Sequence, residues 1–394
     1  MRIAFFSNFL NHHQLPLCRA LLACEGVDFT FVATEPIESE RLNMGYADMN
    51  AEPFVLREYE KGGKDAAMDL AVSADVMIFG AAPVHYLQAR MQEGKLTFYF
   101  TERVLKKGAW RRFIPTTRKK LKRQFLDHKA RPLYVLAASA YMAADLKKMG
   151  FPDGRCLKWG YFPAVYQKDV DSLINLKGRK EKVQIMYAGR LMKLKRVIDA
   201  LKAVKALVKG GTTNFVFSII GEGEQKERLM RYVQKNGLVN YVEFKPFMPS
   251  DEVRTAMDGA DVYFFGSDFR EGWGAVVNEA MNSACAVVVS HAVGSAAHLI
   301  EHGKNGLIYE CGNVKDLTHC FESVINCKEY RQSLGRRAYD TVVSEWSAER
   351  AASALTAVID ALASGEQAGK VCPSGVCAQS PVLKNGWIKG AKRR

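Results

Sequence analysis

The sequence predicts an α/β protein with two doubly wound, Rossmann-like domains that face each other across a cleft. Short, nearly continuous apolar runs alternate with helix-like stretches, a pattern typical of parallel strands covered on both faces. The runs form two series, separated by a polar, turn-rich stretch at 159–181. At 394 residues, the chain is also longer than one hydrophobic core normally supports.

The first series predicts five strands in a domain over 1–166. They are RIAFFS (2–7), DFTFVAT (28–34), DVMIFG (75–80), LTFYFT (96–101) and LYVLAAS (133–139). The second series predicts six strands in a domain over 167–346. They are KVQIMYAGR (182–190), NFVFSIIGEG (214–223), VEFKPF (242–247), DVYFFGS (261–267), CAVVVS (285–290) and GLIYE (306–310).

Beyond the second domain we expect a helix and a basic tail. Residues 347–365 have the apolar spacing of a helix. Residues 366–394 are rich in Gly, Pro, Ser and Lys without an apolar period, which predicts a largely disordered segment.

Composition argues against a secreted or membrane-spanning protein. No apolar run approaches the roughly 18 residues that span a bilayer, and the start, MRIAFFSNFLNHHQ, lacks the features of a signal peptide. The nine cysteines occur without a CxxC pair, which favours reduced thiols in a cytoplasmic protein.

The net charge of +14 is concentrated in two segments. Residues 103–131 carry twelve Lys/Arg against one Asp and residues 366–394 carry six against one Glu, so the rest of the chain sums to −2. In 103–131 apolar residues interleave with the charges, which suits a segment lying on an anionic membrane surface. Nucleic acid is the rival polyanion, although no recognition module is present, and a solvated loop is the third interpretation. The apolar residues are Trp110, Phe113, Ile114, Leu121, Phe125 and Leu126.

The loops after the strands are the candidate sites, because open α/β sheets bind ligands beyond the carboxyl ends of their strands. Arg190 ends one strand and Lys195 follows five residues later. The pair could clamp a diphosphate, or the two could simply be exposed basic residues. Gly221 and Gly223 follow the next strand, where they allow helix amides to face a ligand or form an ordinary turn.

The stretch REGWGAVVNEAMNSAC (270–285) carries two glutamates. Gly272 and Gly274 let the backbone after Glu271 approach a ligand, and the start of a helix over 275–284 favours phosphate. Glu279 can point back toward the same cleft, where its carboxylate suits the adjacent hydroxyls of a ribose. This motif could hold a nucleoside diphosphate, with Glu271 near the group on the β-phosphate.

With the Arg190–Lys195 loop, the E-x7-E motif resembles the retaining, nucleotide-sugar-dependent glycosyltransferases of family 4 (group 1), which have the GT-B fold. Other matching pieces are GRLMKLK (189–195), IIGEGEQKERL (219–229), MPSDEV (248–253) and VGSAAHLIEHGKNGLIYECGNVKDL (293–317). The likeness covers about 187–320, and the first domain matches only in outline.

The resemblance implies a role for each of these residues. Arg190 and Lys195 would grip the donor diphosphate and stabilise the leaving group, and Glu279 would bind the ribose. Glu271 would hold the donor sugar without acting as a covalent nucleophile. Donor contacts would also come from Gly221, Gly223, Gly272, from the amides of Trp273, Gly274, Ala275 and Val276, and, at the base, from Phe247 and Met248. No cofactor or metal is implied, since the nucleotide sugar is a co-substrate.

Several positions depart from the family pattern. Arg196 stands where a Gly usually follows the Lys of the clamp. Gly294-Ser295 and His298 stand where the family usually has Gly-Gly and Glu, and the first loop, SNFLNHHQLP, lacks the usual paired glycines.

The resemblance assigns the first domain to the acceptor. His12 and His13 follow the first strand, and the sequence allows either contact with a ligand or a solvated pair of side chains. His85 follows another strand. Glu102 ends the strand LTFYFT and could orient an acceptor hydroxyl or form a salt bridge with Arg103 or Arg131.

Two motifs suggest a metal and are set aside. HLIEH (298–302) matches a zinc-protease signature, but a turn follows at once and no third ligand is positioned. Asp169-Val-Asp171 resembles the DxD motif of metal-dependent glycosyltransferases but lies in the linker.

We therefore expect a retaining, metal-independent enzyme that transfers a hexosyl-type sugar, UDP-linked, to a lipid-linked oligosaccharide or a cell-surface polysaccharide precursor. We expect it in the cytoplasm, on the inner face of the membrane, without nucleic acid as a partner. The alternatives are a non-catalytic membrane- or nucleic-acid-binding protein on the same scaffold, and a soluble polyglucan synthase.

Overall fold

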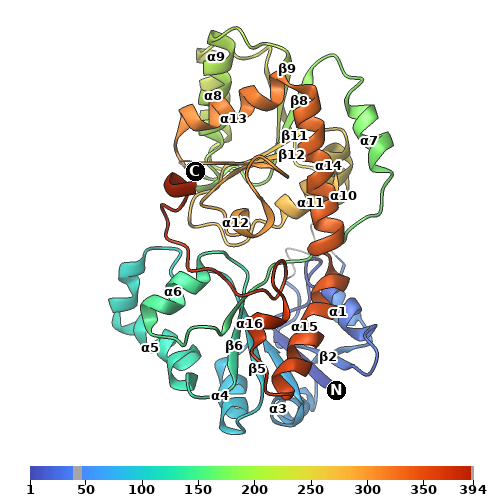
Figure 1. Cartoon of the computed structure of the whole chain (residues 1–394), viewed down its shortest axis with the longest axis vertical. Coiled ribbons are helices and arrows are strands. Elements are labelled where there is room, and N and C mark those ends of the chain that lie inside the picture. Colours follow the sequence, from blue (N-terminus) through green and yellow to red (C-terminus); the bar gives the residue numbers. More distant parts are fainter. Residues whose placement is uncertain (39–46, 392–394) are drawn as a thin grey trace. The chain divides into compact units, whose positions relative to one another are not determined.

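The computed structural model describes residues 1–38 and 47–391, which form two compact units (Figure 1). Unit 1 consists of Met1–Ala164 and Trp346–Lys384, and unit 2 of Val165–Glu345 and Asn385–Arg394. The break at Ala164–Val165 lies within the polar stretch where the sequence predicts a boundary. Each unit contains one sheet of parallel strands with helices around it.

Unit 1 has a seven-stranded sheet in the order β3-β2-β1-β4-β5-β6-β7, and every pairing is parallel. Its central strands are buried along nearly their whole length, as their apolar sequences predict. The strands are β1 Arg2–Ser7, β2 Asp28–Ala33, β3 Val55–Arg57, β4 Val76–Phe79, β5 Thr97–Thr101, β6 Leu133–Ala137 and β7 Cys156–Lys158. The helices are α1 Leu15–Leu22, α3 Gly63–Ser73, α4 Val84–Gln92, α5 Pro115–Gln124, α6 Met142–Met149, α15 Ala348–Ala363 and α16 Ala368–Val371, with short 3-10 turns η1 Met49–Ala51, η2 Ala109–Phe113 and η3 Leu126–His128.

Unit 2 has a six-stranded parallel sheet in the order β10-β9-β8-β11-β12-β13. Helix α8 packs with α9 and α13, and α11 packs with α10 and α14, so two helix layers cover the sheet (Figure 1). The strands are β8 Val183–Ala188, β9 Phe215–Ile220, β10 Val242–Lys245, β11 Val262–Phe265, β12 Ala286–Ser290 and β13 Leu307–Tyr309. The helices are α7 Val170–Lys177, α8 Val197–Lys209, α9 Lys226–Lys235, α10 Ser250–Asp258, α11 Val276–Asn282, α12 Ala296–Leu299, α13 Val314–Asn326, α14 Lys328–Glu345 and α17 Ile388–Ala391, with the 3-10 turn η4 Lys193–Lys195.

The strand order sets a switch point in each sheet. In unit 1 the chain proceeds from β1 to one edge and from β4 to the other, and in unit 2 it does the same from β8 and β11. Loops that leave such a pair of neighbouring strands diverge beyond their carboxyl ends and leave room for a ligand. The two switch points are therefore the first places to look for a site.

The segment predicted to be a disordered tail is ordered instead over its described part, 366–391. Cys377 N donates to Lys158 O at 2.9 Å and Ser380 N to Cys156 O at 2.8 Å, so the segment adds an antiparallel bridge to the edge strand β7. Val376, Cys377 and Ala378 are buried. The prediction was wrong because backbone pairing to an exposed sheet edge needs no apolar period in the added segment.

The chain then returns to unit 2, where Ile388 is buried and the carbonyl of Asn385 is 2.8 Å from His291 Nε2. Helix α15, which occupies most of the predicted helix at 347–365, packs against α1 in unit 1. Among the described residues, no helix is both long enough and apolar enough to cross a bilayer.

Candidate functional site

The switch point of unit 2 brings the predicted clamp and the first glutamate together. Lys195 lies in η4, in the loop after β8, and Glu271 lies in the loop after the neighbouring strand β11. Lys195 Nζ is 2.6 Å from Glu271 Oε2, and both side chains are mostly buried. The ammonium also lies 4.9 Å from the centre of the Phe265 ring. A charge-assisted hydrogen bond of this length fixes both groups beside the switch point.

Arg190 is exposed directly after β8. Its carbonyl accepts a hydrogen bond from the Tyr187 hydroxyl at 3.0 Å, which holds the backbone where the strand ends. The guanidinium is therefore available to an anionic ligand at the same end of the sheet as Lys195.

Arg196 has φ 52°, in the left-handed region that favours Gly. Its side chain forms an ion pair with the buried Asp199, with Nη2 2.7 Å from Oδ2. The structure thus gives a physical reason for the departure from the family pattern, because the ion pair compensates for a conformation that Gly would adopt without strain.

Gly221 and Gly223 bring the loop after β9 against the loop after β8. Their φ angles are 135° and 150°, and a Cβ at these positions would lie 2.2 Å from Gly189 O and 2.6 Å from Leu191 O. The amide of Leu191 donates to Glu222 O at 2.7 Å. This contact accounts for both glycines without a ligand, and their contact with a donor stays a prediction.

The stretch after Glu271 is anchored by its tryptophan. Trp273 is 1% exposed, and its Nε1 donates to Asn278 Oδ1 at 2.9 Å. Gly274 has φ 81°, and a Cβ there would lie 2.7 Å from the Phe265 ring. The carbonyl of the buried Gly272 accepts from Gly294 N at 3.1 Å. The backbone after Glu271 is thereby fixed next to the loop after β12.

Helix α11 is shorter than the predicted 275–284. It begins at Val276, one residue after Ala275, and ends at Asn282. Ala284 has φ 48°, so the backbone leaves the right-handed helical conformation there.

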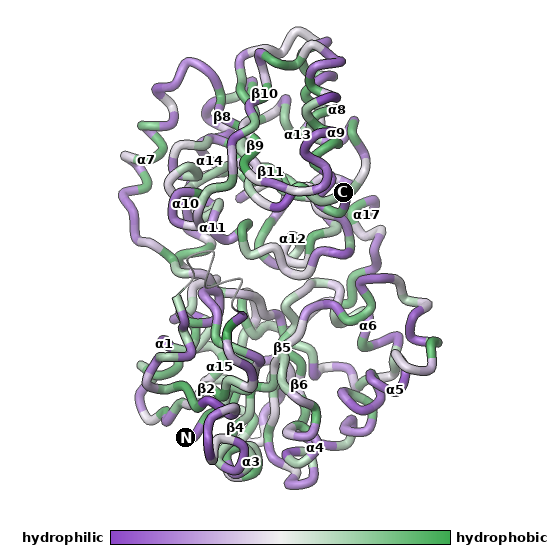
Figure 2. Tube along the Cα trace, turned by 180° about the vertical axis from the view of Figure 1, so that it is seen from behind, coloured by the Kyte–Doolittle hydropathy of each residue, from purple (hydrophilic) through white to green (hydrophobic). Residues whose placement is uncertain are grey.

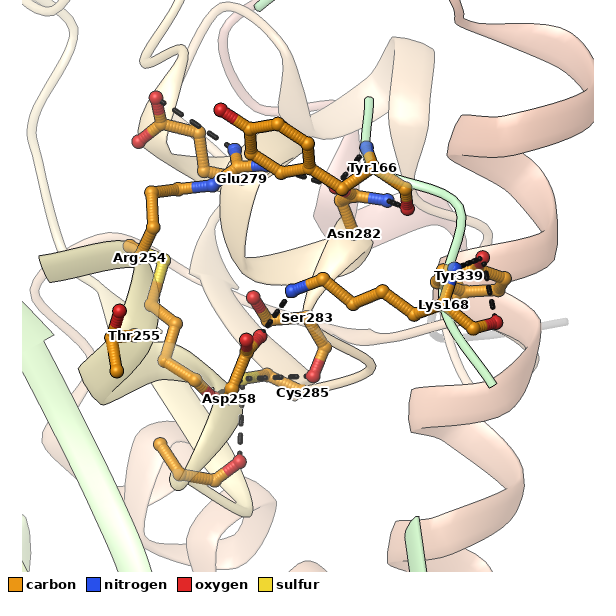
Figure 3. A network of polar contacts seen from close by, with 12 residues as sticks. Tyr166, Lys168, Arg254, Thr255, Asp258, Glu279, Asn282, Ser283, Cys285 and Tyr339 are labelled. Carbon is orange, nitrogen blue, oxygen red and sulfur yellow. Dashed lines mark hydrogen bonds and ion pairs between the residues drawn. The ribbon is translucent and has the colours of Figure 1, made fainter. Parts of the chain in front are cut away.

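Glu279 lies on α11 and is paired with a residue that sequence reasoning missed. Arg254, on α10, has Nη1 3.9 Å from Glu279 Oε1, and the two side chains are 12% and 17% exposed. Burial raises the pKa of Glu279, and the charge of Arg254 counteracts this effect. Figure 3 shows Tyr166 and Asn282 gathered around the same guanidinium.

Phe247 and Met248 follow β10, one strand beyond β9 in the sheet. The Phe247 side chain is 60% exposed and Met248 is half-buried. An exposed aromatic residue at the carboxyl end of a strand is a surface on which a flat base could stack.

The predicted acceptor residues lie on unit 1, around its own switch point. His12 and His13 follow β1, with ring centres 3.8 Å apart, and the exposed His85 begins α4 after β4. Glu102 follows β5, and its Oε2 lies 3.1 Å from Lys106 Nζ, so it forms a salt bridge with Lys106.

Tyr161 is a second residue that sequence reasoning missed. Burial and the hydrogen-bonded Glu102 carboxylate together raise the pKa of its hydroxyl. Its ring centre lies 6.1 Å from that of His13. The link between Tyr161 and Glu102 spans 59 positions, and no local pattern announces it.

The two metal-like motifs have structural roles. His302 Nδ1 accepts a hydrogen bond from Ile308 N at 2.9 Å, and His298 is buried 5.9 Å from the Trp273 ring. The Asp169 carboxylate caps α7 by accepting from Ser172 N at 3.0 Å. The described residues contain no cluster of three His, Cys, Asp or Glu side chains that could hold a metal ion.

The basic segment divides its apolar residues between the core and the surface. Leu121 and Phe125 are buried, whereas Trp110 and Phe113 are 61% and 70% exposed on η2. Arg112 lies 4.4 Å from the centre of the Phe113 ring. Helix α5 beside them is largely hydrophilic, purple in Figure 2.

Solved structures share this architecture. The chain aligns over 92% of its length with the whole of an Anabaena HepE structure in complex with UDP, with a TM-score of 0.67 and 16% identity. It aligns over 86% of its length with 96% of the lipopolysaccharide outer core galactosyltransferase WaaB, with a TM-score of 0.59 and 17% identity. The protein has the GT-B fold. At these identities the likeness concerns the fold alone.

Residues 172–341, most of unit 2, match the family model of the glycosyl transferases group 1. An uncharacterized glycosyltransferase of Methanocaldococcus jannaschii is 30% identical over 151 residues, which are 38% of this chain and 40% of that protein. The poly(glycerol-phosphate) alpha-glucosyltransferase of Bacillus subtilis is 26% identical over 179 residues, 45% of this chain and 26% of that protein. The lipopolysaccharide core biosynthesis glycosyltransferase LpsE of Rhizobium meliloti is 24% identical over 165 residues, 42% of this chain and 46% of that protein. The chain thus matches less than half the length of each of these relatives, and the match supports a group 1 glycosyltransferase.

Proposed function

We propose that the protein is a retaining, metal-independent glycosyltransferase that moves a hexosyl-type sugar from a nucleoside-diphosphate sugar to a lipid-linked oligosaccharide or a cell-surface polysaccharide precursor. The observation that carries this proposal is the Lys195–Glu271 pair at the switch point of unit 2, with Glu279 on the helix that follows. The relatives that act on lipopolysaccharide and on poly(glycerol-phosphate) support the class of acceptor.

The residues divide the proposed reaction between them. The sugar–phosphate bond breaks while the acceptor hydroxyl attacks the same face of the sugar and gives its proton to the departing diphosphate oxygen, so the configuration at that carbon is retained. Arg190 and Lys195 stabilise the negative charge that develops on the departing diphosphate. Glu271 orients both the sugar hydroxyls and the Lys195 ammonium, and Glu279 accepts hydrogen bonds from the ribose. On unit 1, Glu102, His12, His13 and His85 bind the acceptor.

The test is a thermal-shift series with nucleoside diphosphates and nucleotide sugars in the absence of divalent metal. UDP is tried first, because the HepE structure contains it. We expect stabilisation by one nucleotide, and binding about tenfold or more weaker in Glu279→Ala, because hydrogen bonds to the charged carboxylate are lost. The exposed Glu227 on α9 provides the control Glu227→Ala, which should behave as the wild type.

The alternatives differ in outcome. If the folded protein is stabilised by no nucleotide, the proposed enzyme activity is contradicted, and the non-catalytic binding protein on the same scaffold is favoured. Polymer extension of a glucan primer, unaffected by neutralisation of the basic segment, would favour the soluble polyglucan synthase.

We also propose that the enzyme works in the cytoplasm, on the inner face of the membrane, through residues 103–131. The exposure of Trp110 and Phe113 among Arg and Lys side chains supports this, because such aromatic residues insert at the membrane interface while the charges meet anionic headgroups. The proposal does not include nucleic acid as a partner.

A further inference from the structure

Arg254 contacts Glu279, Asn282 and the Tyr166 ring within a polar network of unit 2 (Figure 3). Its Nη2 donates to Asn282 Oδ1 at 2.9 Å, and its guanidinium lies 4.8 Å from the centre of the Tyr166 ring. Asn282 in turn fixes Tyr166, accepting from its backbone N at 2.9 Å and donating to its backbone O at 3.0 Å. The guanidinium is therefore held by groups other than Glu279.

The two glutamates of the motif are neutralised in different ways. Glu271 is hydrogen-bonded to Lys195 at 2.6 Å, so one of its oxygens is occupied. Glu279 has its cation at 3.9 Å, too far for a hydrogen bond but close enough for a strong Coulomb interaction in a mostly buried site. Its carboxylate keeps its capacity to accept two hydroxyl hydrogen bonds.

We propose that Arg254 is a positioning residue that keeps Glu279 ionised and oriented, so that both carboxylate oxygens can accept hydrogen bonds from the ribose of a nucleoside diphosphate. This inference rests on the proposed function for the identity of the ligand. The charge effect of Arg254 on Glu279 can be measured without any ligand.

Among the described residues, the charged and titratable side chains around Glu279 include Arg254, Tyr263 and the phenol of Tyr166, whose ring lies against the Arg254 guanidinium. Arg254 on α10 favours the carboxylate, and Tyr263 on β11 is a phenol whose pKa burial raises well above its usual range. Tyr263 is therefore neutral at physiological pH, and Arg254 is the group that offsets the burial of Glu279. Without it, Glu279 would take up a proton at a higher pH and would lose acceptor capacity.

The first experiment measures UDP affinity between pH 5.5 and 8.5 for the wild type, Arg254→Met and Arg254→Lys. We expect the Lys variant to follow the pH profile of the wild type, and the Met variant is compared with the wild type at each pH. Arg254→Met should bind weakly at low pH and recover as the pH rises, with affinity falling up to about tenfold per pH unit below the raised pKa of Glu279. The exposed Arg231 on α9 gives the control Arg231→Met, which should show the wild-type profile.

A purely structural Arg254 would lower affinity equally at every pH, and such a parallel profile overturns the proposal. Affinity in the Met variant that equals the wild type at pH 5.5 also overturns it.

The second experiment measures stability against pH without nucleotide. A carboxyl group whose folded pKa is raised loses stabilisation as the pH rises from its unfolded pKa through its folded pKa. Arg254→Met should extend this loss to higher pH, and the double variant Arg254→Met/Glu279→Gln should abolish the extension. Identical pH profiles for Arg254→Met and the double variant would contradict the proposal.

The binding and stability measurements test the proposed function and the role of Arg254 separately. A wild type that binds no nucleotide refutes the proposed function, while the stability profiles still decide whether Arg254 controls Glu279. If Arg254→Met fails to fold, the double variant, which lacks the buried carboxylate, should fold; failure of both means that Arg254 is structural and the inference is wrong.

Discussion

At the scale of single residues, the site depends on cations that each meet one acidic partner. Lys195 meets Glu271 by direct hydrogen bonding, Arg254 meets Glu279 at longer range, and Arg196 meets Asp199. Only the first of these pairs joins residues that the E-x7-E motif and the clamp predict together. Arg254 reaches Glu279 only because α10 packs against α11, whereas Arg196 and Asp199 are three positions apart at the start of α8.

Substitutions of Arg196 test the balance between the strain of its backbone and its ion pair with Asp199. Arg196→Gly relieves a left-handed conformation that costs about 1–2 kcal/mol in a non-glycine residue, but it leaves the buried Asp199 without its cation. Arg196→Ala loses the cation and keeps the strain. We therefore expect Arg196→Ala to be less stable than Arg196→Gly by about 1 kcal/mol in urea denaturation.

The control removes the buried charge in both backgrounds. With Asp199→Asn added, the Gly and Ala variants should both regain stability, and the difference between them should persist. Equal stability of the Gly and Ala variants would mean that the backbone at 196 is not strained.

At the scale of elements, the sequence predicts every strand described in unit 2 and misses two edge strands of unit 1. Six strands are predicted in the second domain and six are present, but unit 1 has β3 and β7 in addition to the five predicted. Both are three residues long and end in a basic residue, whereas the equally short β13 is apolar throughout and is therefore recognisable. The tail escaped prediction for a related reason, since the edge of β7 supplies the pairing.

The candidate site follows the same division. Loops after β8 and β11 could be predicted, because parallel strands carry their ligands at one end. Arg254 and Tyr161 could not, because their partners Glu279 and Glu102 lie 25 and 59 positions away and nothing local marks the contact. Of the apolar residues in 103–131, the sequence alone does not separate the buried Phe125 from the exposed Trp110.

The element η2 carries the prediction for membrane binding. Trp110→Ala/Phe113→Ala should weaken binding to vesicles of phosphatidylcholine with an anionic lipid by about tenfold or more, because two exposed aromatic side chains no longer enter the interface. Vesicle sedimentation measures this. The matched control is Leu22→Ala/Leu176→Ala, which changes two exposed apolar residues outside the segment and should leave binding unchanged.

Two results would count against the membrane surface. Equal binding to neutral and anionic vesicles would remove the role of the charge. Tight binding to DNA or RNA at the salt concentration at which vesicles are released would instead favour nucleic acid as the polyanion.

At the scale of the whole molecule, the chain is not divided between its units as two consecutive segments. Unit 1 needs Trp346–Lys384, which supplies α15 against α1 and the pairing to β7, whereas the predicted donor residues all lie within 190–279 of unit 2. Unit 2 receives only the short final segment that contains Ile388. The two units should therefore differ in how they respond to separation.

Residues 165–345 expressed alone are expected to fold cooperatively and to show the same nucleotide preference as the whole protein in thermal-shift measurements. Their melting temperature should be somewhat lower, because Ile388 no longer packs and the ion pair between Lys389 and Glu310 is lost.

Residues 1–164 alone should aggregate, since the face of α1 that α15 covers and the edge of β7 are both exposed. Joining 346–384 to 1–164 should restore a monomer. A soluble, cooperatively melting 1–164 would show that the returning segment is dispensable, and an unfolded 165–345 would show that the donor site depends on the rest of the chain.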